Sequence, residues 1–202
     1  MAGTGEENDE SLMLRVNRGD HHAFALLVRR HTKMFFAAAY RMCGETQAAE
    51  DLVQEAFLKL WEKPGAWDPN RGTKFTTWFY RVVTNMAIDR QRREKRYADP
   101  KVMDSIADRG PRADEKLQSD EEQEILERAI SRLPERQKAA LNLCMYEGLS
   151  NREAAEVLGV GVKALESLLM RAKAGLKEEF VKEGLIKNDL RIDEYERRRF
   201  HA

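Results

Sequence analysis

Hydrophobic residues recur three and four positions apart along most of this sequence, which is the spacing of one face of an α-helix. The first clear stripe runs from Phe24 to Phe35. Few segments alternate with a period of two and β-branched runs are scarce, so no strands are expected. The pattern predicts an all-α protein, with later helices at about 47–63, 76–93, 125–133, 134–146, 152–158 and 163–180.

Proline and glycine interrupt the helical pattern in two places. One is a loop at 64–72, and the other lies at 108–112, inside a poorly periodic stretch. Such a stretch between two periodic regions is typical of an interdomain linker. We expect two small helical domains at 10–97 and 120–180, a flexible linker at 98–119, and a charged C-terminal extension at 181–202.

The charges balance overall but are segregated along the chain. The sequence has 35 Lys and Arg against 35 Asp and Glu, which excludes a uniformly basic nucleic-acid binder. The charged residues of 71–96 are nevertheless mostly basic, and those of 114–127 are mostly acidic. One hypothesis is that the acidic segment screens the basic one when the protein is free.

Several functional classes lack the residues they need. The two cysteines, Cys43 and Cys144, are far apart and are expected to be small buried hydrophobes. His31 lies on an apolar stripe and is expected in a core, and the four histidines are not grouped with carboxylates at ligand spacing. We therefore expect no metal, no cofactor and no catalytic residues, and an enzyme such as a nuclease is disfavoured. The polar N-terminus and the absence of a long apolar run indicate no membrane segment and a cytoplasmic protein.

The helix at 47–63 has one polar face with two interpretations. The first interpretation is a solvated surface without a specific function, and the second is an acidic docking surface for a basic partner. In the second interpretation Leu58 and Trp61 are the apolar anchors. The polar positions of interest on this face are Asp51, Gln54 and Glu55.

The next helix combines aromatic, amide and guanidinium side chains. Thr76 and Thr77 are its expected N-caps. A row at helical spacing then suits base edges and phosphates, and the nearby aromatics could stack on unpaired bases. The alternative is that these aromatics are all core. The row comprises Trp78, Arg81, Asn85, Asp89, Arg92 and Arg96, and the aromatics are Phe75, Trp78, Phe79 and Tyr80, of which Phe79 is assigned to the core.

The second domain carries a helix-turn-helix pattern. Ser150 and Glu153 form a capping box, Ala155 is small where two helices would approach, and Gly159 permits the turn. The expected buried stripe of the last helix is Leu165, Leu168, Leu169, Ala172 and Leu176. The opposite face would enter a DNA major groove, and the alternative is an ordinary helical hairpin that packs on a partner.

Taken in order, these segments resemble a known family. The matching blocks are 49–57, 75–85, 133–137 and 147–150, which lie on both sides of the linker. The chain resembles bacterial RNA polymerase sigma factors of the extracytoplasmic-function type. The resemblance implies that 10–97 is sigma region 2, that 120–180 is sigma region 4, and that the protein directs core polymerase to promoters and helps to melt them. It also implies three partners, namely core polymerase (the β′ clamp helices and the β subunit), promoter DNA and an anti-sigma factor.

The resemblance assigns roles to individual residues. Docking on the polymerase falls to Asp51, Gln54, Glu55 and Leu58. Recognition of the minus-ten element falls to Arg71, Lys74, Trp78, Arg81, Asn85, Asp89, Arg92 and Arg93, with the loop 68–74 holding a flipped base. Recognition of the minus-thirty-five element falls to Asn151, Arg152, Lys163, Glu166, Ser167, Met170, Arg171 and Lys173.

The match departs from the family at two positions and leaves one rival. Many family members carry a basic residue where Glu166 stands and an arginine where Leu168 stands, so the family's base preference is not carried over there. The rival hypothesis is a helix-turn-helix regulator that never acts as a polymerase subunit. It would need no acidic docking face on the helix at 47–63.

Overall fold

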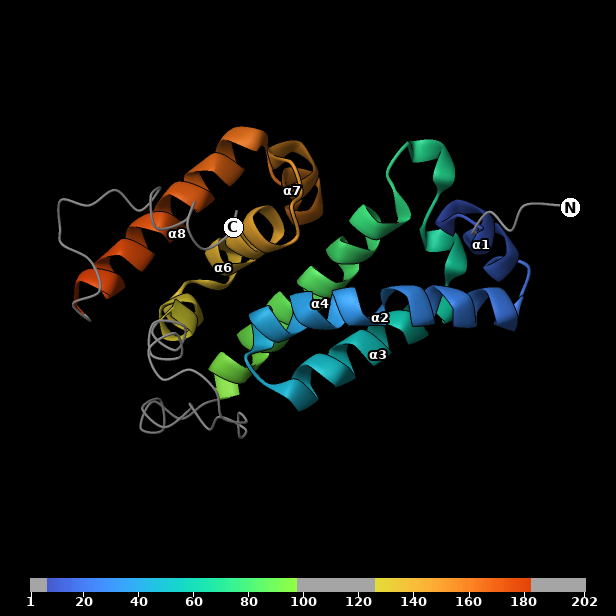
Figure 1. Cartoon of the computed structure of the whole chain (residues 1–202), viewed down its shortest axis with the longest axis horizontal. Coiled ribbons are helices and arrows are strands. Elements are labelled where there is room, and N and C mark those ends of the chain that lie inside the picture. Colours follow the sequence, from blue (N-terminus) through green and yellow to red (C-terminus); the bar gives the residue numbers. More distant parts are fainter. Residues whose placement is uncertain (1–6, 98–125, 183–202) are drawn as a thin grey trace, which may run out of the picture. The chain divides into compact units, whose positions relative to one another are not determined.

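The computed structural model describes residues 7–97 and 126–182, and within these ranges every regular element is a helix (Figure 1). The chain divides into two compact units, residues 1–87 and 88–202. The expected linker at 98–119, most of the acidic segment at 114–127 and nearly all of the extension at 181–202 lie outside the described residues. The helices are α1 (Asp9–Val16), α2 (His21–Cys43), α3 (Thr46–Glu62), α4 (Phe75–Tyr97), one over 126–132, α6 (Glu135–Leu141), α7 (Asn151–Leu158) and α8 (Val162–Lys182).

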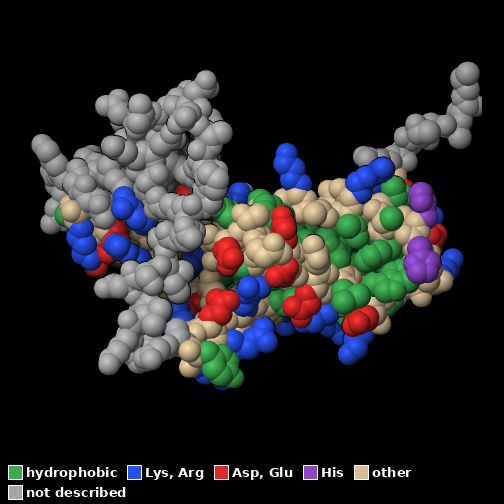
Figure 2. Space-filling model, turned by 90° about the horizontal axis from the view of Figure 1, so that it is seen from below, with side chains coloured by type: hydrophobic (Ala, Val, Ile, Leu, Met, Phe, Trp, Pro, Cys, Tyr) green, Lys and Arg blue, Asp and Glu red, His purple; other side chains and the backbone are tan. Residues whose placement is uncertain are grey.

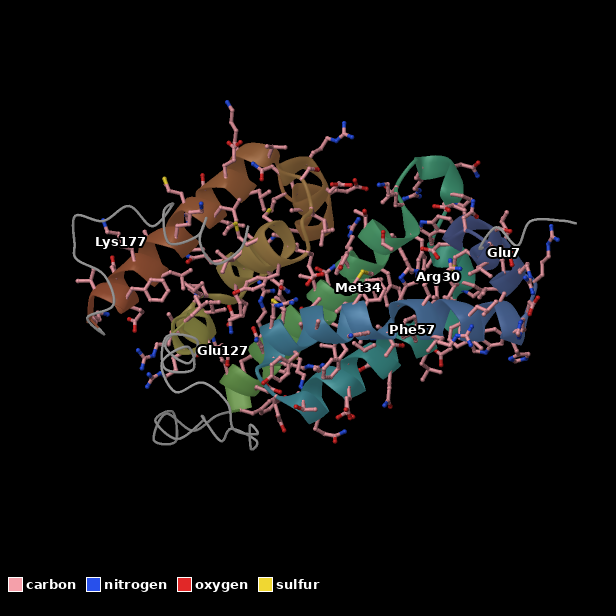
Figure 3. The ribbon with its side chains drawn as sticks, in the orientation of Figure 1. Glu7, Arg30, Met34, Phe57, Glu127 and Lys177 are labelled. Atoms are coloured by element: carbon pink, nitrogen blue, oxygen red, sulfur yellow. The ribbon has the colours of Figure 1, made fainter. Side chains whose placement is uncertain are left out.

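The first unit is built around an aromatic core. The rings of Phe35 and Phe79 lie 4.6 Å apart, and those of Phe57 and Phe79 lie 4.7 Å apart. Phe35 and Phe79 are fully buried, so α2, α3 and α4 share one hydrophobic centre. Phe57, labelled in Figure 3, is buried as well. Edge-to-face and tilted ring pairs of this kind stabilise a core beyond the area that they bury.

Helix α1 was not predicted from the sequence. Its buried residues are Leu12, Met13 and Val16, and two turns are too short to show a clear period. Asp9 links it to α2, because its carboxylate lies 2.6 Å from Arg30 Nη1 and 2.8 Å from His31 Nε2. The burial of His31 confirms its predicted place in the core.

The loop after α3 is more ordered than its composition suggests. It holds two short 3₁₀ turns, Pro64–Ala66 and Pro69–Arg71. Trp67 is 2% exposed, and its indole N–H donates to the carbonyl of Thr73 at 3.1 Å. Asp68 caps the second turn by accepting from the N–H of Asn70. The buried ring of Trp67 therefore anchors the loop to the unit, and the segment 68–74 follows directly after this anchor.

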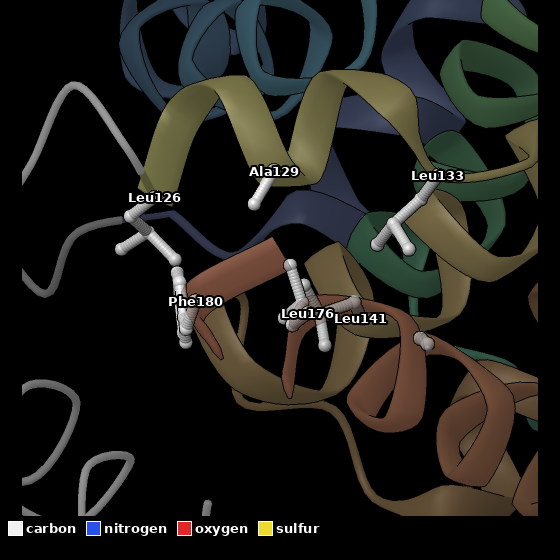
Figure 4. Close-up of a cluster of buried hydrophobic side chains, with 7 residues drawn as sticks. Leu126, Ala129, Leu133, Leu141, Leu176 and Phe180 are labelled. Carbon is white, nitrogen blue, oxygen red and sulfur yellow. The ribbon is translucent and has the colours of Figure 1, made fainter. Parts of the chain in front are cut away.

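The second unit has its own core, shown in Figure 4. Gly175 of α8 lies against Leu133, the residue that follows the helix over 126–132, and an added Cβ would lie 3.1 Å from Leu133 Cδ2. A larger residue there would require the Leu133 side chain to shift by a few tenths of an ångström. The cluster comprises Leu126, Ala129, Leu133, Leu141, Ala172, Leu176 and Phe180.

Local signals close the helix-turn-helix as the sequence predicts. Ser150 accepts from the Glu153 N–H, and the Glu153 side chain accepts in return from the Ser150 N–H, which completes the capping box. Gly159 ends α7 at φ 62°, in the left-handed region that suits glycine. Ala155 is buried at 3% exposure, as the close approach of the two helices requires.

Four expectations need correction. Helix α4 begins at Phe75, so Thr76 and Thr77 lie inside it and are not its caps. Phe75 and Tyr80 are buried, because the aromatic core recruits them, and they are not available to stack on bases. Cys43 and Cys144 are half-buried free thiols, and partial burial raises the pKa of Cys144. Leu168 and Leu169 are only half-buried, so the buried stripe of α8 is narrower than predicted.

Candidate functional site

Helix α3 presents one polar face to solvent. Asp51, Gln54, Glu55 and Leu58 are all exposed, and Leu58 is 54% exposed in spite of being apolar. They lie at i, i+3, i+4 and i+7, which places them on one side of the helix. In the space-filling view, acidic and hydrophobic side chains mingle on the surface of the first unit (Figure 2). The face can therefore accept basic groups beside one apolar contact.

Two neighbouring side chains contact the carboxylates of this face. Gln47 donates to Asp51 Oδ1 at 2.9 Å, and Lys59 lies 2.8 Å from Glu55 Oε1. Both contacts are exposed and worth little in water. Trp61, expected as a second anchor, is half-buried and turned inward, because its ring lies 5.1 Å from that of Phe24. Trp61 packs α3 on α2, which leaves Leu58 as the apolar point of the face.

Helix α4 carries the predicted polar row on one exposed side. Arg81, Asn85, Asp89 and Arg92 are exposed at intervals of four, four and three residues. Val83 and Ala87 are buried on the opposite side and fix the orientation of the helix. Guanidinium and amide groups in such a row can contact phosphates and base edges together. Arg93, also assigned to this site, is exposed as well.

Trp78 begins that row and is the aromatic residue with access to solvent at this end of α4. It is half-buried, with its ring 6.2 Å from Phe75 and 6.0 Å from Phe79. The indole therefore packs on the core while part of it stays accessible to solvent. Such a ring can stack on a base without losing its own packing.

Two basic residues of the neighbouring loop are also exposed. Arg71 has 83% of its side chain exposed and lies 3.7 Å from Asp68, a distance that gives only a weak ion pair. Lys74 immediately precedes α4 and is exposed. Since Trp67 anchors the loop, these two cations extend from a fixed support toward solvent.

The second unit exposes one face of the helix-turn-helix. Met170 is 66% exposed, although it is apolar. Ser167 and Lys173 are half-buried, and the Ser167 hydroxyl donates to the carbonyl of Lys163 at 2.9 Å. The exposed members of the predicted set are Asn151, Arg152, Lys163, Glu166, Met170 and Arg171.

Sequence reasoning missed Arg136, which orders the turn before α8. Its Nη2 donates to the carbonyl of Leu158 at 2.8 Å, at the end of α7. That carbonyl is one of the groups that a helix leaves without an internal partner. The contact joins residues 22 positions apart, so no local pattern could have revealed it.

The described residues hold no group of three or more metal-ligating side chains. None of the helices over 7–97 and 126–182 has the length and apolarity that a membrane crossing requires.

Comparison with known proteins finds matches to both parts of the chain. The family model described as sigma-70 region 2 matches residues 27–97, and the one described as sigma-70 region 4 matches residues 123–176. The chain is 31% identical to the ECF RNA polymerase sigma factor SigW of Bacillus subtilis strain 168, over 82% of this chain and 92% of that protein. It is 32% identical to the RNA polymerase sigma-H factor of Pseudomonas aeruginosa, over 85% of this chain and 93% of that protein.

A solved structure shows the same architecture. It is the structure of CnrH in complex with the cytosolic domain of CnrY, with CnrH being an RNA polymerase sigma factor of Cupriavidus metallidurans. The match has a TM-score of 0.62 and 25% identity, and it covers 84% of this chain and 95% of that one.

Proposed function

This chain belongs to the extracytoplasmic-function RNA polymerase sigma factors of the sigma-70 family, and from that premise we propose which of its surfaces meets each partner. As a transcription initiation factor it binds core polymerase and directs it to promoters. We place residues 10–97 as region 2 and 120–180 as region 4. It acts in the cytoplasm, where polymerase and chromosome are, and it performs no covalent chemistry of its own.

The acidic face of α3 docks on the β′ clamp helices. Asp51 and Glu55 supply the negative charge, Gln54 a hydrogen-bonding amide, and Leu58 an apolar contact. The observation that carries this assignment is the exposure of Leu58, an apolar side chain, on the same helix face as three exposed polar side chains. Interfaces of this kind depend on a desolvated centre with a polar rim.

The exposed side of α4 and the loop 68–74 contact the minus-ten element. Arg81, Asn85 and Arg92 can bind phosphates and base edges, while Trp78 offers a supported ring to a base extruded from the duplex. Extrusion costs a few kcal/mol, which stacking and pocket contacts offset. This combination suits the melting step as well as recognition. The further members of the set are Arg71, Lys74, Asp89 and Arg93.

The exposed face of α7 and α8 contacts the minus-thirty-five element in the major groove. A carboxylate at Glu166 accepts a hydrogen bond from cytosine N4 and repels phosphate, so it favours a base contact over a backbone contact. Half-buried Ser167 and Lys173 lie at the edges of the face. The remaining members are Asn151, Arg152, Lys163, Met170 and Arg171.

An anti-sigma protein regulates the chain by covering these surfaces. The support is that CnrH, with which this chain shares its fold, was solved with the cytosolic domain of CnrY bound. The rival hypothesis of a regulator independent of polymerase does not account for the region 2 match, which spans α3 and α4.

Charge reversal on α3 tests the assignment. The double variant Asp51→Arg and Glu55→Arg is expected to bind core polymerase at least about tenfold more weakly, because like charges would face each other across the interface. The matched control is Glu50→Arg, an exposed carboxylate on the same helix outside the face. Binding to core and transcription from a promoter library are measured with the full chain. Unchanged core binding by the double variant would remove α3 as the docking helix.

A further inference from the structure

The solvent side of α2 carries a stripe of cations and aromatic rings that the assignments above leave unused. Arg29, Lys33, Phe36 and Tyr40 lie at intervals of four, three and four residues, which places them on one face. We call this set the α2 stripe. It lies opposite the buried face formed by Leu27, His31, Phe35, Ala38 and Met42.

The charge of α2 is of one sign. Its 23 residues include Arg29, Arg30, Lys33 and Arg41 and no aspartate or glutamate. Arg30 is neutralised by Asp9 at 2.6 Å. Arg29 and Lys33 are exposed, and among residues 7–97 and 126–182 neither forms an ion pair, whereas their neighbours Arg30 and His31 contact Asp9. The two cations of the stripe are therefore available to an anionic ligand.

The two rings of the stripe are stacked on each other. The centroids of Phe36 and Tyr40 lie 6.1 Å apart with 23° between the ring planes. Tyr40 is 37% exposed and Phe36 is half-buried. Because the core is on the other side of α2, the packing of the unit does not call for aromatic rings here. A supported pair of nearly parallel rings offers a further flat group a surface on which to stack.

We propose that the α2 stripe binds single-stranded DNA, with Tyr40 stacking on a base and with Arg29 and Lys33 contacting phosphates. Cations beside aromatic rings are the two components of such sites. The stripe extends about 16 Å along the helix, which is long enough for several nucleotides. The proposal rests on the proposed function in one respect: the single-stranded DNA comes from a promoter that polymerase has opened.

An acidic protein segment is the other occupant that the charge of the stripe would suit. Protein interfaces are usually centred on a pocket that receives an anchor side chain. The stripe offers a projecting stacked ring pair with cations at one end, and it contains no aliphatic side chain. These features favour a ligand made of flat bases and regularly spaced phosphates.

The test measures the affinity of the full chain for a fluorescein-labelled oligothymidine by anisotropy. Tyr40→Ala is expected to weaken binding roughly 5- to 150-fold, the factor that corresponds to one lost base stack. Tyr40→Phe should bind as the wild type does. The double variant Arg29→Gln and Lys33→Gln should lower the slope of log K against log salt by about 1.4, or about 0.7 for each lost phosphate contact.

Two controls separate a site from general attraction. Arg18→Gln removes an exposed cation elsewhere on the first unit, and Leu14→Ala removes a half-exposed apolar side chain of α1. Both should bind the oligonucleotide as the wild type does. Equal losses in Arg18→Gln and in the stripe variants, or no loss in Tyr40→Ala, would overturn the proposal.

Core-polymerase binding is measured in parallel. If the stripe variants keep their affinity for the oligonucleotide but lose affinity for core, the stripe is a protein-docking surface and the proposal is wrong. Failure of the α3 assignment would leave the oligonucleotide measurement unaffected, so the two proposals fail separately. Circular dichroism confirms that each variant is folded, and the double variant Arg29→Gln and Lys33→Gln carries the test if Tyr40→Ala is not.

Discussion

At the scale of single residues, fixed hydrogen bonds set the properties of individual charges. The carboxylate of Asp20 caps α2 by accepting from the N–H groups of His22 and Ala23, and it also pairs with Arg15. The Ala23 hydrogen bond and then the Arg15 contact hold the pKa of Asp20 below its ordinary value. A carboxyl whose pKa is lower in the folded state stabilises the fold at pH values above its unfolded pKa, near 3.9.

We predict that Asp20→Asn lowers the melting temperature at pH 7. Asparagine still caps the helix but carries no charge for Arg15. The difference from the wild type should shrink as the pH falls below about 4 and vanish once Asp20 itself is protonated. Thermal melts from pH 7 to pH 2.5 measure this, with the exposed Glu50→Gln as the control. A difference that stayed constant over this range would contradict the assignment.

A second prediction at this scale concerns Arg171, which is exposed on α8. Arg171→Ala should weaken binding to the cognate promoter by about 1–3 kcal/mol if the side chain reaches a base or phosphate. Lys177→Ala, six residues further along the same helix, should have a smaller effect. Wild-type affinity in the arginine variant would take Arg171 off the list of contacts.

At the scale of elements, caps and turns decide where helices begin and end. The α7–α8 pair starts at a complete capping box and turns at a left-handed glycine. Ser150→Ala should destabilise the second unit by about 1 kcal/mol, because it leaves the first N–H groups of α7 without the hydroxyl. Ser131→Ala is the control, since its hydroxyl bonds a carbonyl inside a helix. Equal melting temperatures for Ser150→Ala and the wild type would count against the capping box.

The turn itself depends on a contact from a third element. Arg136→Met should leave the helices formed but loosen the end of α7, because the Leu158 carbonyl loses its donor. We expect faster amide exchange over 158–162 and promoter binding about tenfold weaker. Gln137→Met, at the half-buried neighbouring position, is the matched control. If exchange in the turn were unchanged, Arg136 would have no positioning role.

At the scale of the whole molecule, the chain is two compact units with separate cores. Leu176→Ala removes a side chain that is 5% exposed in the second core, and Leu27→Ala removes one fully buried in the first. Each should cost about 2–5 kcal/mol through lost burial and the cavity left behind. We predict that each variant destabilises its own unit and spares the other, as measured by residue-resolved amide exchange. Equal destabilisation of both units would show that they unfold together.

The sequence alone determined most of the local structure, because helical periodicity, caps and glycine turns act within a few residues. The stripes of α2 to α4, the capping box at Ser150 and the turn at Gly159 were all readable in this way. The family was recognisable for the same reason, since its motifs are contiguous blocks. The short helix α1 was not predicted, because two turns show too little periodicity.

Tertiary structure decided which side chains each surface retains. Phe75, Trp78 and Tyr80 are aromatic residues of one short segment, and the sequence does not distinguish their burial. In the structure Phe75 and Tyr80 are buried in the core, whereas Trp78 is only half-buried. Trp61 is drawn inward by Phe24 while Leu58 stays exposed, and Arg136 finds its carbonyl across 22 residues. Burial depends on neighbours supplied by other helices, and such contacts leave no periodic trace in the segment itself.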